Sequence, residues 1–364
     1  MKVLYCSHTA DLKGSAISIH QLITGIGAKG FQPAAVFSKN GPLAEELRKR
    51  DIPAYVLKRR GFLGLGLIRE ALDVIRRERP AIVHLNSAVP FCKYVAIAAR
   101  IKRLPIIWHV REDPEGKRVR KLKKWINLLS DRVLVVSTDL EEFFRPGGKV
   151  SKVYNGVDAE KFRPDISGSR FRNKYGIPEA AFVFGMVGTI EERKGYMLFL
   201  KAAEALPQDE SVRFLIVGSG SPEDEKKVRD FLKERPGLSD QVILTGRLSD
   251  MPEVMAGIDV LVMPSLWEGF PRALIEAMAA GRPAIATDVG EVRYIIEDGS
   301  TGFIIRKGDA AGLEERMSAC IGMGDGLKEM GRLARESVYR FSVQAHIQNV
   351  AFKYEEVLAD RRAV

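Results

Sequence analysis

The chain has 364 residues, of which 46% are apolar, and it carries a formal net charge of +10. This length and apolar content exclude a disordered chain and favour two globular domains of about 150 to 190 residues each. Its three cysteines are far apart and lack Cys-x-x-Cys spacing, which argues against a disulfide framework and a zinc site.

The apolar residues are not concentrated in one segment. No uninterrupted apolar stretch approaches the roughly 18 residues that a membrane span needs, and we expect no N-terminal signal peptide. The expected compartment is therefore the cytoplasm.

The charge is divided unevenly along the chain. Residues 1–165 hold 31 Lys and Arg against 17 Asp and Glu, a net of +14, whereas residues 166–364 hold 26 against 30, a net of −4. This asymmetry predicts that the first half meets something anionic, either a phosphate-bearing acceptor or a lipid surface.

In the first half, short β-branched runs alternate with amphipathic helical patterns. The strand candidates are Val3–Ser7, Ala34–Phe37, Ala54–Leu57, Ile82–Leu85, Ile106–Val110, Val133–Val136 and Val150–Tyr154. Helical patterns between them include Ile17–Ile26, Pro42–Arg50 and Leu67–Arg77. This alternation is typical of βαβ units, so it predicts a parallel sheet with helices on both faces.

The second half repeats the scheme. Its strand candidates are Phe182–Val187, Phe214–Val217, Val242–Thr245, Val260–Met263, Ala284–Thr287 and Phe303–Ile305. Helices are expected near Gly195–Ala205, Glu223–Glu234, Arg272–Ala280 and Ala310–Cys320. The predicted fold class is therefore α/β, with two Rossmann-like, doubly wound parallel-sheet domains.

A turn-rich segment, Asn155–Pro164, separates the two halves and is the expected hinge. We therefore predict an N-terminal domain over residues 1–164 and a C-terminal domain over residues 165–342. The amphipathic pattern of residues 343–364 is expected to cross back and brace the first domain.

Two carboxylates stand eight positions apart in the last third of the chain. Glu268 follows the apolar run Val260–Met263 and precedes a Gly-Pro break, whereas Glu276 falls inside the next helical pattern. The N–H groups at the start of that helix can receive phosphate. A sugar nucleotide has hydroxyls at both ends and a diphosphate between them, so two acids beside an amide-rich turn match it. Ordinary surface and helix-dipole chemistry is the alternative explanation for an isolated acid pair.

The motifs occur in an order that resembles the GT-B retaining glycosyltransferases, and more narrowly those of family 4. They are Asp11–Ser15, Asn155–Asp158, Val187–Gly195, Val217–Gly220, Thr245–Arg247, Pro264–Gly281 and Glu297–Phe303. Each motif is weak alone, whereas seven in the same order make a strong resemblance across most of the chain. The resemblance implies a GT-B fold in which the two domains face each other across a cleft, and donor binding mainly by the second domain.

By this resemblance, side chains of the second half bind the donor. Lys194 would hold the diphosphate and stabilise the leaving nucleoside diphosphate, assisted by Arg193. The family usually has an arginine where this chain has Thr189, so one diphosphate contact is expected to be missing. Glu276 would accept hydrogen bonds from the ribose hydroxyls, and Glu268 would face the transferred sugar.

Backbone groups would complete the donor site. Pro271 has no N–H to offer phosphate, but the residues around it do. These are Phe270, Arg272 and Ala273. The base-binding loop is expected at Gly246, Arg247 and Leu248.

The first half is expected to contribute a small-residue loop and one histidine. Gly14 and Ser15 follow the first strand, where small residues let the backbone approach a ligand. His109 ends the fifth strand candidate, at the edge where doubly wound sheets bind ligands. A single strand-end histidine is more often structural, but the family frequently has one here that contacts the sugar. A general base is not required, because the leaving phosphate is commonly proposed to take the acceptor's proton.

Two basic stretches of the first half suit an anionic membrane surface. Basic side chains bind the lipid headgroups of such a surface, and aromatic side chains insert partly into it. Lys58, Arg59 and Arg60 form the first. The second lies at helical spacing within residues 117–126 and includes Lys117, Arg118, Lys121, Lys124 and Trp125. A solvated helix face is the alternative, and nucleic acid is disfavoured because no aromatic-basic recognition motif accompanies the charge.

Together these features predict a retaining glycosyltransferase that moves a sugar from a nucleotide diphosphate donor to a hydroxyl of a glycan or lipid-linked acceptor, on the inner face of the cell membrane. No metal or other cofactor is expected, since the chain has no Asp-x-Asp. A sugar-nucleotide epimerase and a non-catalytic sugar-nucleotide-binding protein of the same fold remain alternatives. A nicotinamide dehydrogenase is rejected because the segment Gly218–Glu223 lacks the third glycine of Gly-x-Gly-x-x-Gly.

Overall fold

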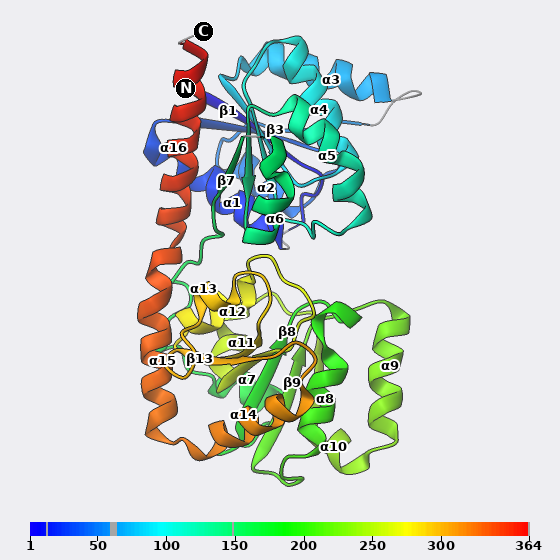
Figure 1. The fold of residues 1–364 in the computed structure, drawn as a ribbon, viewed down its shortest axis with the longest axis vertical. Helices are drawn as coiled ribbons and strands as arrows, with labels where there is room; N and C mark the ends of the chain where they lie inside the picture. Colours follow the sequence, from blue (N-terminus) through cyan, green and yellow to red (C-terminus); the bar gives the residue numbers. More distant parts are fainter. Residues whose placement is uncertain (12–13, 59–63, 148, 363–364) are drawn as a thin grey trace. The chain divides into compact units, whose positions relative to one another are not determined.

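The computed structural model describes residues 1–11, 14–58, 64–147 and 149–362. The chain divides into two compact units (Figure 1). Met1–Gly156 and Val343–Val364 form the first unit, and Val157–Ser342 forms the second. Each unit is built around one parallel sheet, as the alternating strand and helix patterns predicted.

The sheet of the first unit has seven strands in the order β3-β2-β1-β4-β5-β6-β7. These are β1 (Lys2–Ser7), β2 (Gln32–Phe37), β3 (Ala54–Val56), β4 (Ile82–Asn86), β5 (Ile106–Val110), β6 (Arg132–Val135) and β7 (Val150–Lys152). The intervening helices are α1 (Ser15–Gly25), α2 (Pro42–Lys49), α3 (Leu65–Glu78), α4 (Pro90–Ile101), α5 (Lys117–Leu129) and α6 (Thr138–Phe144). The strand order reverses between β1 and β4, and ligand sites of doubly wound sheets lie at the carboxyl edge of such a reversal.

The last helix, α16 (Val343–Arg362), belongs to the first unit and packs against α1 (Figure 1). Its apolar face enters the same core as β1 and β2, and Tyr354 is fully buried there. The Tyr354 hydroxyl lies 3.1 Å from that of Tyr5 and 2.8 Å from Nδ1 of His84. A buried tyrosine needs such partners, so these bonds fix where α16 docks on this sheet.

The sheet of the second unit has six strands in the order β10-β9-β8-β11-β12-β13. These are β8 (Phe182–Val187), β9 (Val212–Val217), β10 (Val242–Gly246), β11 (Val260–Met263), β12 (Ala284–Thr287) and β13 (Gly302–Ile305). The helices are α7 (Ser169–Lys174), α8 (Tyr196–Glu204), α9 (Pro222–Lys233), α10 (Pro236–Gln241), α11 (Met251–Gly257), α12 (Arg272–Ala279), α13 (Val292–Ile295), α14 (Ala310–Gly322) and α15 (Asp325–Val338).

Glycines bring backbones together at the carboxyl edge of this second sheet. Gly188 follows β8 with φ of 154°, and Gly218 follows β9 with φ of 153°. A Cβ on Gly218 would lie 1.7 Å from the carbonyl oxygen of Gly188, so no larger residue fits without backbone movement. These motif glycines therefore serve the close packing of two loops where donor binding was predicted.

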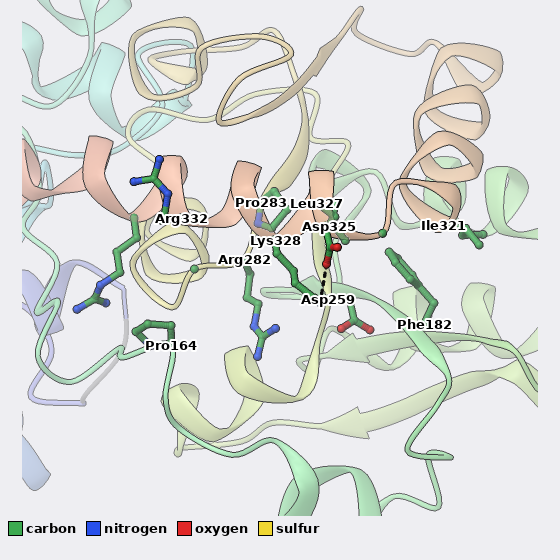
Figure 2. Close-up of a pocket in the computed structure, with 13 residues that line it drawn as sticks. Pro164, Phe182, Asp259, Arg282, Pro283, Ile321, Asp325, Leu327, Lys328 and Arg332 are labelled. Carbon is green, nitrogen blue, oxygen red and sulfur yellow. Dashed lines mark hydrogen bonds and ion pairs between the residues drawn. The ribbon is translucent and has the colours of Figure 1, made fainter.

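The opposite edge of the same sheet borders a cavity of about 640 Å³ (Figure 2). Phe182, Asp259 and Pro283 stand at the amino ends of β8, β11 and β12, and the corner between α14 and α15 covers them. Lys328 and Asp325 of that corner are joined by an ion pair of 2.8 Å. None of the residues that line this cavity belongs to the predicted donor site.

Within the described ranges, no helix combines the length and the apolar character that crossing a bilayer would require.

Candidate functional site

The motif Pro264–Gly281, called the acid block below, begins with a loop that leads from β11 into α12. This loop, residues 264–271, is called the acid loop. Pro271 caps α12 in an extended conformation and, having no N–H, leaves the first helical amides to the residues after it. Glu268 lies on the loop and Glu276 lies inside α12, as the sequence predicted, and both side chains are buried. A buried carboxylate needs charged or hydrogen-bonding partners, so the contacts of each acid define the site.

The main contact of Glu268 is an ion pair with Lys194, which lies in the short 3-10 helix η4 (Glu192–Lys194) after β8. Lys194 Nζ lies 2.6 Å from Glu268 Oε1, and the two side chains are only 20% and 8% exposed. Arg193 Nη1 lies 3.8 Å from Glu268 Oε2. Partial burial strengthens such Coulomb interactions relative to water, so two cations converge on one acid at the edge of the sheet.

Backbone contacts hold the Lys194 loop and the acid loop together. The N–H of Leu266 donates to the Arg193 carbonyl at 2.8 Å, and Arg193 Nη1 donates to the Trp267 carbonyl at 3.0 Å. Gly195 has φ of 76°, and a Cβ there would lie 2.1 Å from the Pro264 carbonyl oxygen. The motif Arg193-Lys194-Gly195 therefore combines two cations with the one residue type that permits this approach.

Glu276 pairs with Arg272, one turn earlier in α12. Arg272 Nη2 donates to Glu276 Oε1 at 2.8 Å, and both side chains are largely buried. Only a backbone role was expected for Arg272, and this side-chain contact was not predicted. Its signal was the i,i+4 spacing, which places two side chains on the same helix face.

The other predicted donor residues of the second unit lie at or after the ends of β8, β10 and β11, and their side chains differ in exposure. The side chain of Phe270 is buried against Phe341, with ring centroids 5.1 Å apart, while Ala273 is half-buried in the first turn of α12. Gly246 ends β10 with φ of 67°, followed by exposed Arg247 and half-buried Leu248. These last residues lie at the carboxyl edge of β10, and Thr189 is exposed beyond β8.

In the first unit, Gly14 caps α1 with φ of 44°, at the carboxyl side of β1. Ser15 begins that helix, but its side chain lies outside the described residues. A Cβ on Gly14 would meet no atom of the described residues within 4 Å, so none of them crowds this helix start. The backbone around Gly14 can therefore be approached by a ligand, as small residues at this position predict.

His109 is fully buried near the end of β5. Its ring centroid lies 5.6 Å from that of His84 and 6.1 Å from that of His346. Arg111 Nη2 lies 3.2 Å from His109 Nδ1, and because arginine can only donate, this contact leaves the proton on Nε2. Burial, reinforced by the Arg111 charge, holds the pKa of His109 well below its ordinary value, so the ring is neutral at pH 7.

Sequence reasoning missed two hydroxyls that support Glu268. Ser265 is fully buried, and its Oγ donates to Glu268 Oε1 at 2.8 Å. Thr287, at the end of β12, donates from Oγ1 to the Ser265 carbonyl at 2.5 Å. The only sequence signal for the contact between Ser265 and Glu268 was their spacing of three residues. The contact with Thr287 depends on how β11 and β12 pair.

The basic stretch of residues 117–126 forms most of α5, which contacts α4 on one flank of the first unit (Figure 1). Val119, Leu122 and Ile126 are buried on its inner face. The predicted cations Lys117, Arg118, Lys121 and Lys124 are exposed, together with Trp125 at 40% and Leu128 at 71%. Lys58 is also exposed, whereas Arg59 and Arg60 lie outside the described residues.

Two family models match the chain. Residues 12–161 match the model described as Glycosyltransferase Family 4, and residues 181–322 match the model described as Glycosyl transferases group 1. The first match covers most of the seven-stranded unit, and the second covers the unit that holds the acid block.

Curated relatives are similar over both units. The putative glycosyltransferase EpsD of Bacillus subtilis is 31% identical over 296 residues, which cover 79% of this chain and 73% of that protein. N-acetyl-alpha-D-glucosaminyl L-malate synthase of Bacillus anthracis is 28% identical, with coverage of 81% and 79%. UDP-Gal:alpha-D-GlcNAc-diphosphoundecaprenol alpha-1,3-galactosyltransferase of Escherichia coli is 28% identical, with coverage of 65% for each chain.

Solved structures share the fold. Anabaena Alr3699/HepE, determined in complex with UDP-glucose, aligns with a TM-score of 0.85 at 22% identity over 98% of this chain and all of that one. WaaG, a glycosyltransferase involved in lipopolysaccharide biosynthesis, aligns with a TM-score of 0.74 at 15% identity over 96% and 98%. Together with the two parallel sheets, these alignments confirm the predicted GT-B fold.

Proposed function

Because the chain belongs to the glycosyltransferases of family 4, we propose that it transfers a sugar with retention from a nucleotide diphosphate donor to a hydroxyl of a glycan or lipid-linked acceptor. The observation that carries the proposal is the partly buried pair of Lys194 and Glu268 beside α12. It combines a cation for a diphosphate with an acid for a sugar hydroxyl in one loop cluster.

Lys194 is the proposed electrostatic catalyst. Its ammonium group has three N–H donors, so it has donors for a phosphate oxygen beyond the one that it gives to Glu268 Oε1. Charge fixed at this position stabilises the negative charge that develops on the departing diphosphate. Arg193 would share this task in place of the arginine that the family usually has at the position of Thr189.

The two acids have separate proposed roles. Glu268 would accept a hydrogen bond from a sugar hydroxyl, and Glu276 would accept bonds from the ribose hydroxyls with the oxygen that Arg272 leaves free. The amides at the start of α12 would receive phosphate. In a retaining transfer the acceptor attacks from the face that the diphosphate leaves, so a departing phosphate oxygen can take the acceptor's proton.

The proposed reaction uses no metal ion. Lys194, Arg193 and the first amides of α12 supply the positive charge that a divalent cation would otherwise provide at a diphosphate. We expect the transfer rate to be unchanged by a chelator such as EDTA, and a rate restored only by added Mg²⁺ or Mn²⁺ would contradict this part of the proposal.

The acceptor is proposed to lie at an anionic membrane surface. Helix α5 exposes several cations together with Trp125 and Leu128, a combination that suits lipid headgroups and the boundary of the acyl chains. His109, Gly14 and Ser15 of the same unit are proposed to face the donor sugar.

The test is a screen of UDP-, GDP- and ADP-sugars by thermal shift, followed by transfer assays with the stabilising donor. We expect one donor class to raise the unfolding temperature and to give glycosylated product with retained anomeric configuration. Conversion of the donor to another sugar nucleotide without acceptor would identify an epimerase. Donor affinity with no turnover on glycan or lipid-linked acceptors would identify a binding protein.

A further inference from the structure

Ser265 has a geometry that its place in the acid loop alone does not explain. It follows β11 and Pro264, is fully buried, and donates from Oγ to Glu268 Oε1 at 2.8 Å. Its carbonyl in turn accepts the Thr287 hydroxyl at 2.5 Å. The serine backbone is therefore tied to β12 while its only side-chain proton is given to the acid.

The contacts of Glu268 separate its two carboxylate oxygens. Oε1 receives hydrogen bonds from Ser265 and from Lys194, which together fill its two lone pairs. Oε2 has Arg193 Nη1 at 3.8 Å, beyond hydrogen-bond distance. Oε2 is therefore the oxygen with the capacity to accept a hydroxyl proton from a ligand.

We infer that Ser265 is a positioning residue that holds Glu268 by Oε1 so that Oε2 meets a hydroxyl of the donor sugar. This inference rests on the proposed glycosyl transfer. Thr287 acts one step further away, because its hydrogen bond fixes the backbone from which Ser265 donates.

A second hydrogen-bond donor to Glu268 Oε1 matters because Lys194 has two proposed tasks, to hold Glu268 and to bind the diphosphate. Lys194 has a long flexible side chain, and movement toward a diphosphate oxygen would loosen its hold on Glu268. Ser265 has one side-chain rotamer bond and a backbone fixed by Thr287, so its bond to Oε1 persists through such movement. The serine thus keeps the acid oriented while the lysine follows the leaving group.

The experiment compares Ser265→Ala with Ser130→Ala. Ser130 is also fully buried, and its Oγ has no hydrogen-bond partner among the described residues, so it controls for loss of a buried hydroxyl. The readouts are kcat and KM with the donor that the wild type uses, and the Kd of the matching nucleoside diphosphate by calorimetry. Ser265→Thr tests rescue, because threonine keeps the hydroxyl.

We expect Ser265→Ala to lower kcat about 10- to 100-fold, as misplacement of a positioned group does. Affinity for the nucleoside diphosphate should stay within about twofold, because that ligand lacks the transferred sugar that Glu268 is proposed to contact. Ser265→Thr should recover much of kcat, and Ser130→Ala should match the wild type.

Three results would overturn the inference. One is an unchanged kcat in Ser265→Ala. Another is a parallel loss of kcat and of nucleoside diphosphate affinity, which would show that Ser265 merely supports the fold of the whole loop. The third is a Ser265→Thr variant that folds, with an unfolding temperature near that of the wild type, yet recovers no kcat. A wild type that turns over no sugar nucleotide would instead reject the proposed transfer itself.

Discussion

At the scale of single residues, the proposed donor site depends on which atoms of each charged side chain are available to a ligand. Lys194 gives one of its three N–H donors to Glu268, and Arg272 donates to one carboxylate oxygen of Glu276. Each acid therefore keeps one oxygen for a ligand hydroxyl. The internal pairs hold the charged groups in place before a ligand binds, which lowers the entropy lost on binding.

Replacement of Glu276 by alanine is expected to weaken nucleotide binding about tenfold, because charged hydrogen bonds to the ribose and the ion pair with Arg272 would be lost. Calorimetric titration with the matching nucleoside diphosphate measures the change. Glu336→Ala is the control, since Glu336 also pairs with an arginine four residues away but lies exposed on α15. Equal affinities for wild type and Glu276→Ala would remove Glu276 from the ribose site.

The sequence predicted the acid pair and the Lys194 motif but not their partners. Glu268 and Glu276 were visible because a Gly-Pro break separates a strand from a helix. Ser265 was missed because its role needs Thr287, which lies 22 positions away and reaches it only through the pairing of β11 with β12. Contacts between neighbouring strand ends are set by the sheet order, which periodicity does not encode.

At the scale of elements, α5 is an amphipathic surface helix with one buried side and one exposed, basic side. Its buried side fixes it to the first unit through Leu122 and Ile126, while basic residues and Trp125 face outward. Lys93 of α4 lies 5.1 Å from the centre of the Trp125 ring, which adds a further cation beside it. This arrangement supports the proposed contact with an anionic membrane surface.

Neutralising Lys121, Lys123 and Lys124 together is expected to release the protein from anionic liposomes, since each basic residue near such a surface contributes about 1 kcal/mol. Sedimentation with phosphatidylserine-containing vesicles measures the bound fraction. The matched control neutralises Lys226, Lys227 and Lys233, three lysines of α9 in the other unit. Unchanged sedimentation of the α5 variant, or no sedimentation of the wild type, would reject the membrane proposal.

Strands were the most predictable elements, because every strand of both sheets contains a short β-branched or apolar run. Helix α4 was not predicted, because it is mostly apolar and its two charged residues, Lys93 and Arg100, are too few to give an amphipathic pattern. The docking of α16 beside β1 depends on buried hydrogen bonds of Tyr354, which no local pattern reveals.

At the scale of the whole molecule, the two units differ in how they use buried polar groups. The second unit holds the partly buried ion pairs Lys194–Glu268 and Arg172–Asp259, and the first unit buries the rings of His84 and His109 in β4 and β5. Burial, with the Arg111 charge as the second cause, holds the pKa values of His84 and His109 well below their ordinary value of 6.5.

This burial predicts that the protein loses stability in mild acid. Below about pH 6.5 these rings are protonated in the unfolded chain but stay neutral in the folded unit. The free energy of unfolding therefore decreases as the pH is lowered. The free energy of unfolding decreases by up to about 1.4 kcal/mol per pH unit for each ring. This decrease continues until the pH reaches the lowered pKa values of the folded unit. Thermal unfolding at about pH 7.5 and about pH 5.5 measures it. His84→Gln should flatten the dependence, and a wild-type transition that does not move would contradict the assignment.

The most direct test of the donor site is the affinity of Lys194→Ala for the nucleoside diphosphate, chosen from UDP, GDP and ADP by thermal shift. We predict a loss of about 10- to 100-fold, the effect of removing a charged hydrogen bond to a diphosphate, with no change in affinity for the unphosphorylated nucleoside. Lys201→Ala, which removes an exposed lysine of α8, should bind like the wild type. Equal binding by Lys194→Ala, or no binding of any of the three diphosphates by the wild type, would contradict the account.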